Sequence, residues 1–234
     1  MKDQGAPSHR VHHLLDVAIE QTVATYRAAG GQIYCTKGCQ GCCTMTVHAT
    51  LGEASVIAES ITTEQLGRLE DYRVRLLTIL PEAVDFKTFL RLHRTRLGAC
   101  PFLDTSGCCQ IYPLRPLACR ALLSTRPSAW CAADFSILHP AEKEAFRSSL
   151  DRAVVAFPTH YLAAPQSLAK NLEDELISSM SRDFGVAISG LLPLLVLLAR
   201  TDRLGQMAWK GEETIRALLQ KRGVSHPFLI DLHL

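Results

Sequence analysis

Nine cysteines gather in two short stretches of this 234-residue chain, and none lies outside them. The first stretch is Cys35-x3-Cys39-x2-Cys42-Cys43, with two glycines inside it. Glycine lets backbone amides turn toward thiolates, and the two-residue gap between Cys39 and Cys42 is typical of a metal knuckle. Adjacent side chains diverge, so Cys42 and Cys43 either serve two neighbouring sites or leave one thiol in a second-sphere or reactive role. The spacing predicts a metal site, with zinc and an iron–sulfur cluster both open.

The second stretch holds Cys100, Cys108, Cys109, Cys119 and Cys131. Nine residues separate Cys109 from Cys119 and eleven separate Cys119 from Cys131, which is too long for a single knuckle. Tertiary folding must therefore bring these thiols together. Cys108 directly precedes another cysteine and needs no role of its own, so we expect it to lie outside the ligand set.

Charged side chains near the cysteines support a metal site. Four thiolates around Zn²⁺, or around a four-iron cluster of charge 2+, carry a net charge of about −2, which is costly to bury without cations nearby. The two stretches hold three more cationic than anionic side chains: Lys37, Arg115, Arg120 and Arg126 against Asp104. His48 follows Cys43 by five residues and is an alternative second-sphere or fourth ligand. His12 and His13 are expected to be solvated on a helix.

Helices are predicted on both sides of the first cysteine stretch. Apolar residues recur every three or four positions from Val11 to Tyr26, and Gly30-Gly31 ends that helix. Thr50 and Glu53 form the pattern of a capping box before the next helix. Pro116 begins a short helix through Cys119. Further helices are predicted over 63–80 (with a stripe of Leu66, Leu69, Val74, Leu77 and Leu80), 83–97, 141–156, 160–182, 186–200 and 211–222.

Period-two alternation is scarce, so we predict a mostly α fold in which helices hold an irregular, loop-rich cysteine centre. The uncharged run from Phe184 to Ala199 is shorter than the ~20 residues that cross a bilayer, and we expect a buried helix there. His139-Pro140 is expected to separate two parts. These are a cysteine-cluster metal-binding domain with an N-terminal helix, 1–139, and a helical extension, 140–234, packed on the same core.

Composition bears on compartment and partners. The polar N-terminus shows no apolar segment of a secretory signal, so we expect a cytoplasmic protein whose thiols are reduced rather than paired as disulfides. A net charge of +2 without a basic run gives no case for nucleic acid. We expect no transmembrane segment, and a protein or redox partner whose identity stays open.

The segments CTKGCQGCC, CPFLD and CQIYPLRPLACR, with Glu53 between the first two, resemble the YkgJ-type cysteine-cluster proteins, described as a zinc- or iron-chelating domain and as iron–sulfur-cluster-containing. The resemblance covers about residues 34–121; the opening gap has three residues where the family usually has two, and Cys108 is extra. It implies cofactor-binding roles for Arg115 and Arg120, on the family's RPxxCR positions. It also implies a metal centre of eight cysteines, Cys35, Cys39, Cys42, Cys43, Cys100, Cys109, Cys119 and Cys131.

We favour an iron–sulfur protein, with a [4Fe–4S] cluster and a redox, electron-transfer or undefined catalytic role, because a structural zinc site needs only four cysteines. One alternative is a structural or chelating zinc site in a helical interaction protein. A second alternative is a protein lysine methyltransferase-like enzyme, since flagellin lysine-N-methylases look similar in their cysteine motifs. No methyl-donor motif supports it, and no catalytic residue is predicted.

Overall fold

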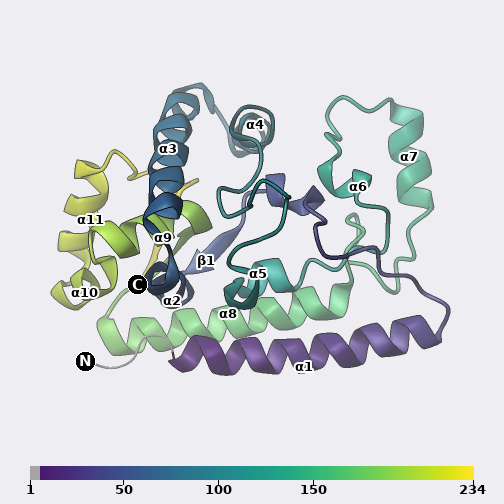
Figure 1. The fold of residues 1–234 in the computed structure, drawn as a ribbon, viewed down its shortest axis with the longest axis horizontal. Coiled ribbons are helices and arrows are strands. Elements are labelled where there is room, and N and C mark those ends of the chain that lie inside the picture. Colours follow the sequence, from purple (N-terminus) through teal and green to yellow (C-terminus); the bar gives the residue numbers. More distant parts are fainter. Residues whose placement is uncertain (1–5) are drawn as a thin grey trace.

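The structure, a computed structural model, describes residues 6–234. It confirms the mostly α fold, because the described residues form eleven α-helices and one small sheet (Figure 1). None of the described helices has the length and apolar character needed to cross a membrane. The helices are α1 (Ala6–Ala28), α2 (Leu51–Ser60), α3 (Thr63–Ile79), α4 (Phe86–Leu92), α5 (Leu117–Arg120), α6 (Ala129–Ala132), α7 (Pro140–Ser148), α8 (Ala163–Phe184), α9 (Leu192–Thr201), α10 (Leu204–Met207) and α11 (Glu212–Lys221). The strands are β1 (His48–Thr50), β2 (Ala187–Leu191) and β3 (Ile230–His233).

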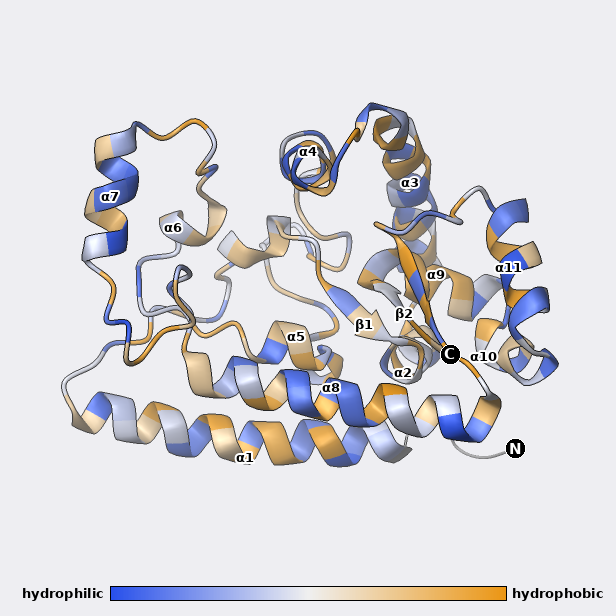
Figure 2. Ribbon diagram, turned by 180° about the vertical axis from the view of Figure 1, so that it is seen from behind, coloured by the Kyte–Doolittle hydropathy of each residue, from blue (hydrophilic) through white to orange (hydrophobic). Residues whose placement is uncertain are grey.

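The two longest helices, α1 and α8, lie side by side along one edge of the molecule (Figure 1). Orange and blue positions alternate along both, as expected of helices with one buried face (Figure 2). Val11 and Leu15 of α1 pack with Leu172 and Leu176 of α8, and Leu117 of α5 joins the same cluster. The helix predicted between Val11 and Tyr26 is therefore confirmed, and its apolar face supports α5.

The capping box at the start of α2 is confirmed. Thr50 Oγ1 accepts from the Glu53 amide at 3.4 Å, while the Glu53 carboxylate accepts from the Thr50 amide at 2.9 Å. The two side chains thus satisfy amides that the first turn of a helix leaves without partners.

The helix predicted over 63–80 is confirmed as α3, but its predicted apolar stripe is partly wrong. Leu69, Tyr72, Leu76 and Ile79 form the buried face, whereas Val74 is 54% exposed. The buried positions follow the helical period. Tyr72 lies on this buried face, and a stripe predicted from aliphatic residues alone leaves it out.

The helix predicted over 186–200 is wrong in its first half, where Ala187–Leu191 form β2 between antiparallel β1 and β3. All five residues of β2 are buried, and a strand buried on both faces shows the same unbroken apolar run as a buried helix. Pro193 then lies in the first turn of α9. A Cβ at Gly190 would lie 2.6 Å from the Leu229 carbonyl oxygen, so β3 approaches where only glycine fits.

Two other boundaries differ from the predictions. The helix predicted over 83–97 is α4 followed by a π-helical turn, η3 (His93–Leu97). The helix predicted over 141–156 ends as α7 at Ser148, and an irregular segment leads to α8. The helices predicted over 160–182 and 211–222 are confirmed as α8 and α11.

The main hydrophobic core draws on both halves of the chain. Leu51 and Ile57 of α2 belong to the same buried cluster as Leu194 and Leu198 of α9. The end of β2 and the start of α9 lie close to the first cysteine stretch. Leu192 donates its amide to the carbonyl of Val47, four residues after Cys43, at 2.8 Å.

Candidate metal centre

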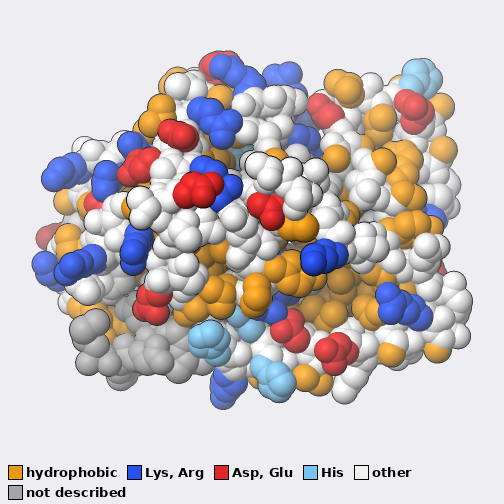
Figure 3. Space-filling view, viewed as in Figure 1, with side chains coloured by type: hydrophobic (Ala, Val, Ile, Leu, Met, Phe, Trp, Pro, Cys, Tyr) orange, Lys and Arg blue, Asp and Glu red, His pale blue; other side chains and the backbone are white. Residues whose placement is uncertain are grey.

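Cysteines from both stretches surround one cavity of about 400 Å³. Side chains of the hydrophobic class, in which cysteine is counted, gather across the middle of the face above the α1–α8 layer, with Lys and Arg among them (Figure 3). Within residues 6–234, no three His, Cys, Asp or Glu side chains already converge as ligands of a single ion. The cysteines on the cavity wall are Cys39, Cys42, Cys43, Cys100, Cys108, Cys109 and Cys119.

Backbone hydrogen bonds hold the two stretches against each other. The first stretch turns as a 3-10 helix, η1 (Gly41–Thr44), and the Cys100 amide donates to the Cys43 carbonyl at 2.8 Å. A bridge between Leu103 and Cys109 closes the next loop on itself. The short α5, preceded by Pro116, carries Cys119 to the same cavity, as predicted for that helix.

Cys35 and Cys131 are not among the residues of the cavity wall. Cys35 Sγ accepts from the Ser124 amide at 3.2 Å, and Cys131 Sγ lies 3.3 Å from His160 Nε2. The first cysteine stretch packs tightly against the start of α6. A Cβ added at Gly41 would lie 2.5 Å from the backbone oxygen of Ser128, the residue before α6. Cys108, which we expected outside the ligand set, does line the cavity.

Burial favours the protonated form of several cavity thiols by raising their pKa. It raises the pKa of Cys100 to about 12 and raises those of Cys109 and Cys119 as well. A hydrogen bond with Cys43, followed by burial, raises the pKa of Cys42. Lys37 and Arg115 are the charged side chains on the wall, and no carboxylate joins them among the described residues. A bound metal cation would displace these protons, so the donor set fits a thiophilic metal.

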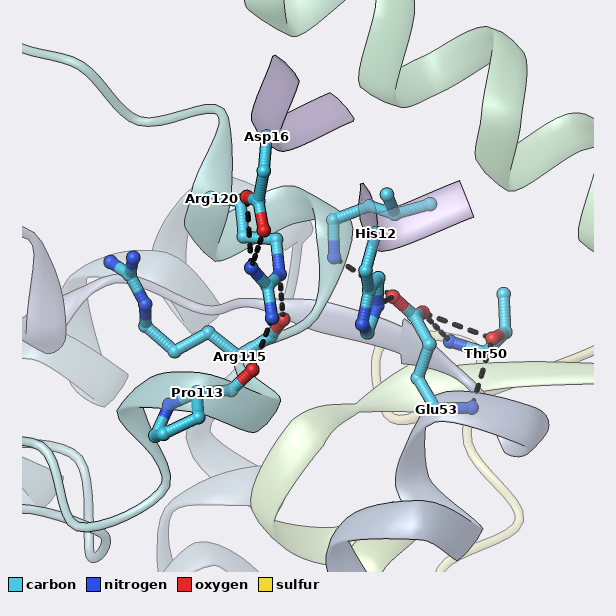
Figure 4. Close-up of polar contacts among 8 residues, drawn as sticks. His12, Asp16, Thr50, Glu53, Pro113, Arg115 and Arg120 are labelled. Atoms are coloured by element: carbon cyan, nitrogen blue, oxygen red, sulfur yellow. Dashed lines mark hydrogen bonds and ion pairs between the residues drawn. The ribbon is translucent and has the colours of Figure 1, made fainter. Parts of the chain in front are cut away.

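The two arginines of the RPxxCR positions occupy different places. Arg115 lines the cavity, and its guanidinium lies 3.6 Å from the centre of the Tyr112 ring. Arg120 instead binds both carboxylate oxygens of Asp16, at 2.8 and 2.6 Å, and donates to the carbonyls of Arg115 and Pro113 (Figure 4). Arg120 therefore ties α1 to the loop that carries Arg115 and is not on the cavity wall.

Glu53 is the centre of a buried network that the sequence analysis did not foresee (Figure 4). Its carboxylate accepts from His12 Nε2 at 2.9 Å and from the Leu117 amide at 2.8 Å, in addition to Thr50. Burial alone would raise the pKa of Glu53, but the hydrogen bonds outweigh it and leave that pKa below its ordinary value. The prediction that His12 is solvated is wrong: it is 7% exposed, whereas His13 is exposed. The helical pattern could have indicated this burial, because His12 lies beside Val11 on the buried face of α1.

Tyr72 and His93 also line the cavity, and neither was predicted as a site residue. They lie 21 positions apart, and each reads in sequence as part of an ordinary helix face. His48, the alternative ligand, is not among the residues of the cavity wall. Its Nδ1 lies 3.8 Å from the Asp231 carboxylate on β3.

Comparison with known proteins supports the centre described above. Residues 34–144 match the family model CxxCxxCC, described as "Putative zinc- or iron-chelating domain". No curated protein and no solved structure matches the chain. The matched segment contains all nine cysteines and every cysteine of the cavity wall. Residues 34–144 thus match the family model of a zinc- or iron-chelating cysteine-cluster domain, in agreement with the cysteine-cluster resemblance of the motifs.

Proposed function

We propose that the chain is an iron–sulfur protein whose cavity holds a [4Fe–4S] cluster. The main support for this proposal is that seven cysteines surround one cavity of about 400 Å³. A single zinc takes four ligands and, with Zn–S bonds of about 2.3 Å, draws its sulfurs to within about 3.8 Å of one another. In a cluster each thiolate binds a different iron, so the ligands stand around a larger volume.

A [4Fe–4S] cluster takes four thiolates, which we draw from the eight family cysteines, and Cys42 has a central place among them. Its thiol interacts electrostatically with Cys100, Cys109 and Cys119 of the second stretch and with Cys35 of the first. Arg115 supplies a cation on the wall, while Arg120 positions the loop before Cys119. The bound cluster would supply one-electron transfer, exchanged with a partner protein.

Metal analysis of the full chain tests this proposal. Protein purified without oxygen is expected to absorb broadly in the visible range and to contain iron and acid-labile sulfide in equal amounts. Cys39→Ser and Cys119→Ser are expected to abolish metal retention, whereas Cys108→Ser, the matched control on the same wall, retains it. Equal metal content in all three variants would contradict the ligand set, and a colourless protein without iron would contradict the cluster.

One observation favours zinc as a second candidate. Cys131 Sγ and His160 Nε2 lie 3.3 Å apart, and both side chains are buried. The two atoms share a hydrogen bond, and their separation is close to the about 3.5 Å between sulfur and nitrogen ligands of a tetrahedral zinc, so the pair could supply two of its four ligands. Stoichiometric zinc without sulfide, lost in His160→Leu, would establish this candidate in place of the cluster.

A further inference from the structure

Two of the eight family cysteines do not lie on the cavity wall, and they lie near each other outside it. Ser124 contacts both: its amide donates to Cys35 Sγ at 3.2 Å, and its side chain interacts with the Cys131 thiol. The two thiols also interact electrostatically with each other. The proposed cluster does not need this pair, because it takes four thiolates and the wall supplies seven.

Backbone hydrogen bonds bring a histidine to the same place. The Tyr34 amide donates to the Ser124 carbonyl at 3.0 Å, and Ser124 forms a β-bridge with Tyr161. The amide of Thr125 donates to the His160 carbonyl at 3.0 Å. These bonds hold His160 beside the two cysteines, although it lies beyond the matched family segment.

The imidazole of His160 is already paired with a sulfur atom. Its Nε2 lies 3.3 Å from Cys131 Sγ, and the two residues are 4% and 5% exposed. Because ligand sulfur and nitrogen atoms of a tetrahedral zinc stand about 3.5 Å apart, an ion that replaces the proton between them needs them only about 0.2 Å farther apart. A metal ion can therefore bind here without a preformed cavity.

We infer that Cys35, Cys131 and His160 bind a zinc ion of their own, in addition to the cluster in the cavity. This site goes beyond the second candidate described above, in which zinc takes the place of the cluster. Within residues 6–234 no three such side chains already converge, so the half-buried Cys35 thiol must close on the buried pair when the ion binds. Water fills the fourth position, which three protein ligands leave open.

The charge and the surroundings of these three ligands suit a buried zinc ion. Two thiolates and a neutral imidazole around Zn²⁺ carry no net charge, so burial costs less than it does for a site of four thiolates. Both sulfur atoms also have polar hydrogens beside them, from the Ser124 amide at Cys35 and from the Tyr161 hydroxyl at Cys131. Donors of this kind orient and stabilise the thiolate ligands of a metal.

Metal analysis of the full chain, produced with zinc in the medium and purified without oxygen, tests this inference. We expect one zinc per chain in addition to the iron and sulfide. Cys131→Ser and His160→Gln are expected to lose the zinc and keep the iron and sulfide, whereas the control Cys108→Ser keeps all three. The metal that Cys119→Ser is expected to lose is the iron of the cavity, so that variant keeps its zinc.

X-ray absorption at the zinc edge reports the ligands in the wild-type chain, without relying on a variant that folds. We expect two sulfur neighbours at about 2.3 Å and nitrogen or oxygen neighbours at about 2.0–2.1 Å. Iron and sulfide without zinc, a zinc ion with four sulfur neighbours, or wild-type zinc content in both Cys131→Ser and His160→Gln would overturn this inference alone. Zinc without iron would overturn the proposed cluster and leave this inference standing.

Discussion

Replacing Glu53 by Gln is expected to destabilise the fold, because the change keeps the shape of a buried side chain while removing its charge. The carboxylate accepts four hydrogen bonds, from His12, the Leu117 amide and both donors of Thr50, at 2.8 to 3.0 Å. Glutamine has one acceptor oxygen, so whichever way its amide lies, a backbone N–H of Thr50 or Leu117 loses its acceptor.

Hydrogen bonds to a charged group contribute about 1.5–3 kcal/mol each, and we therefore expect Glu53→Gln to lower the free energy of unfolding by about 3 kcal/mol. For a chain of this length that corresponds to a fall in Tm of roughly 6–12 °C. Urea and thermal unfolding followed by circular dichroism measure both quantities. Glu59→Gln, at an exposed position of the same helix, is the matched control and should change stability by less than about 0.5 kcal/mol.

The pH dependence of the free energy of unfolding provides a second test of the Glu53 network. The pKa of Glu53 is lower in the folded chain than in the unfolded one, so its charge stabilises the fold above the unfolded value and this contribution is lost as the pH falls through the folded value. The difference between wild type and Glu53→Gln should thus be largest at neutral pH and shrink below about pH 4. A Glu53→Gln variant as stable as the Glu59→Gln control at pH 7 would refute the reasoning.

Three further outcomes are expected. Arg120→Lys keeps one cationic nitrogen for Asp16 but loses the donors to the Arg115 and Pro113 carbonyls, and it should cost about 2 kcal/mol in urea unfolding. Arg216→Lys, in an exposed pair, should cost less than about 0.5 kcal/mol, and equal costs would contradict the role of Arg120. Gly190→Ala should lower the free energy of unfolding by about 2–3 kcal/mol, because the added Cβ would clash with the Leu229 carbonyl oxygen. Gly67→Ala, on an open helix face, should raise it by about 0.5–1 kcal/mol. An unchanged stability in Gly190→Ala would show that β3 can move away. Metal retention against a chelator should fall as the pH drops, because burial raises the pKa of thiols such as Cys100 and each released ligand takes up a proton; retention independent of pH would argue against thiolate ligands.

The parts of the fold that depend on local sequence could be predicted. The α1 face from Val11 and the capping box of Thr50 and Glu53 follow from residues within a few positions of one another. The strand β2 could not, because an apolar run buried on both faces has no period of its own, and only its pairing with β1 and β3 makes it a strand.

The candidate site divides in the same way. The spacing of clustered cysteines indicates metal binding by itself, so the candidate ligands could be predicted from the sequence. Tyr72 and His93 could not, since neither has a motif and their hydrogen bond joins α3 to the π-helical turn η3. The partner of His12 was hidden for the same reason, because Glu53 lies 41 positions away.

The cavity has a wall that the cysteine segment does not supply. Leu191, Leu192 and Pro193 line it from the junction of β2 and α9, about 50 positions beyond the end of the matched family segment. Apolar surroundings control solvent access and dielectric around a metal, and hence its redox behaviour. Substitutions at this junction would therefore change the surroundings of the proposed cluster without altering a single ligand. The same nine-cysteine segment in another host would place its metal against whatever apolar surface that host supplied.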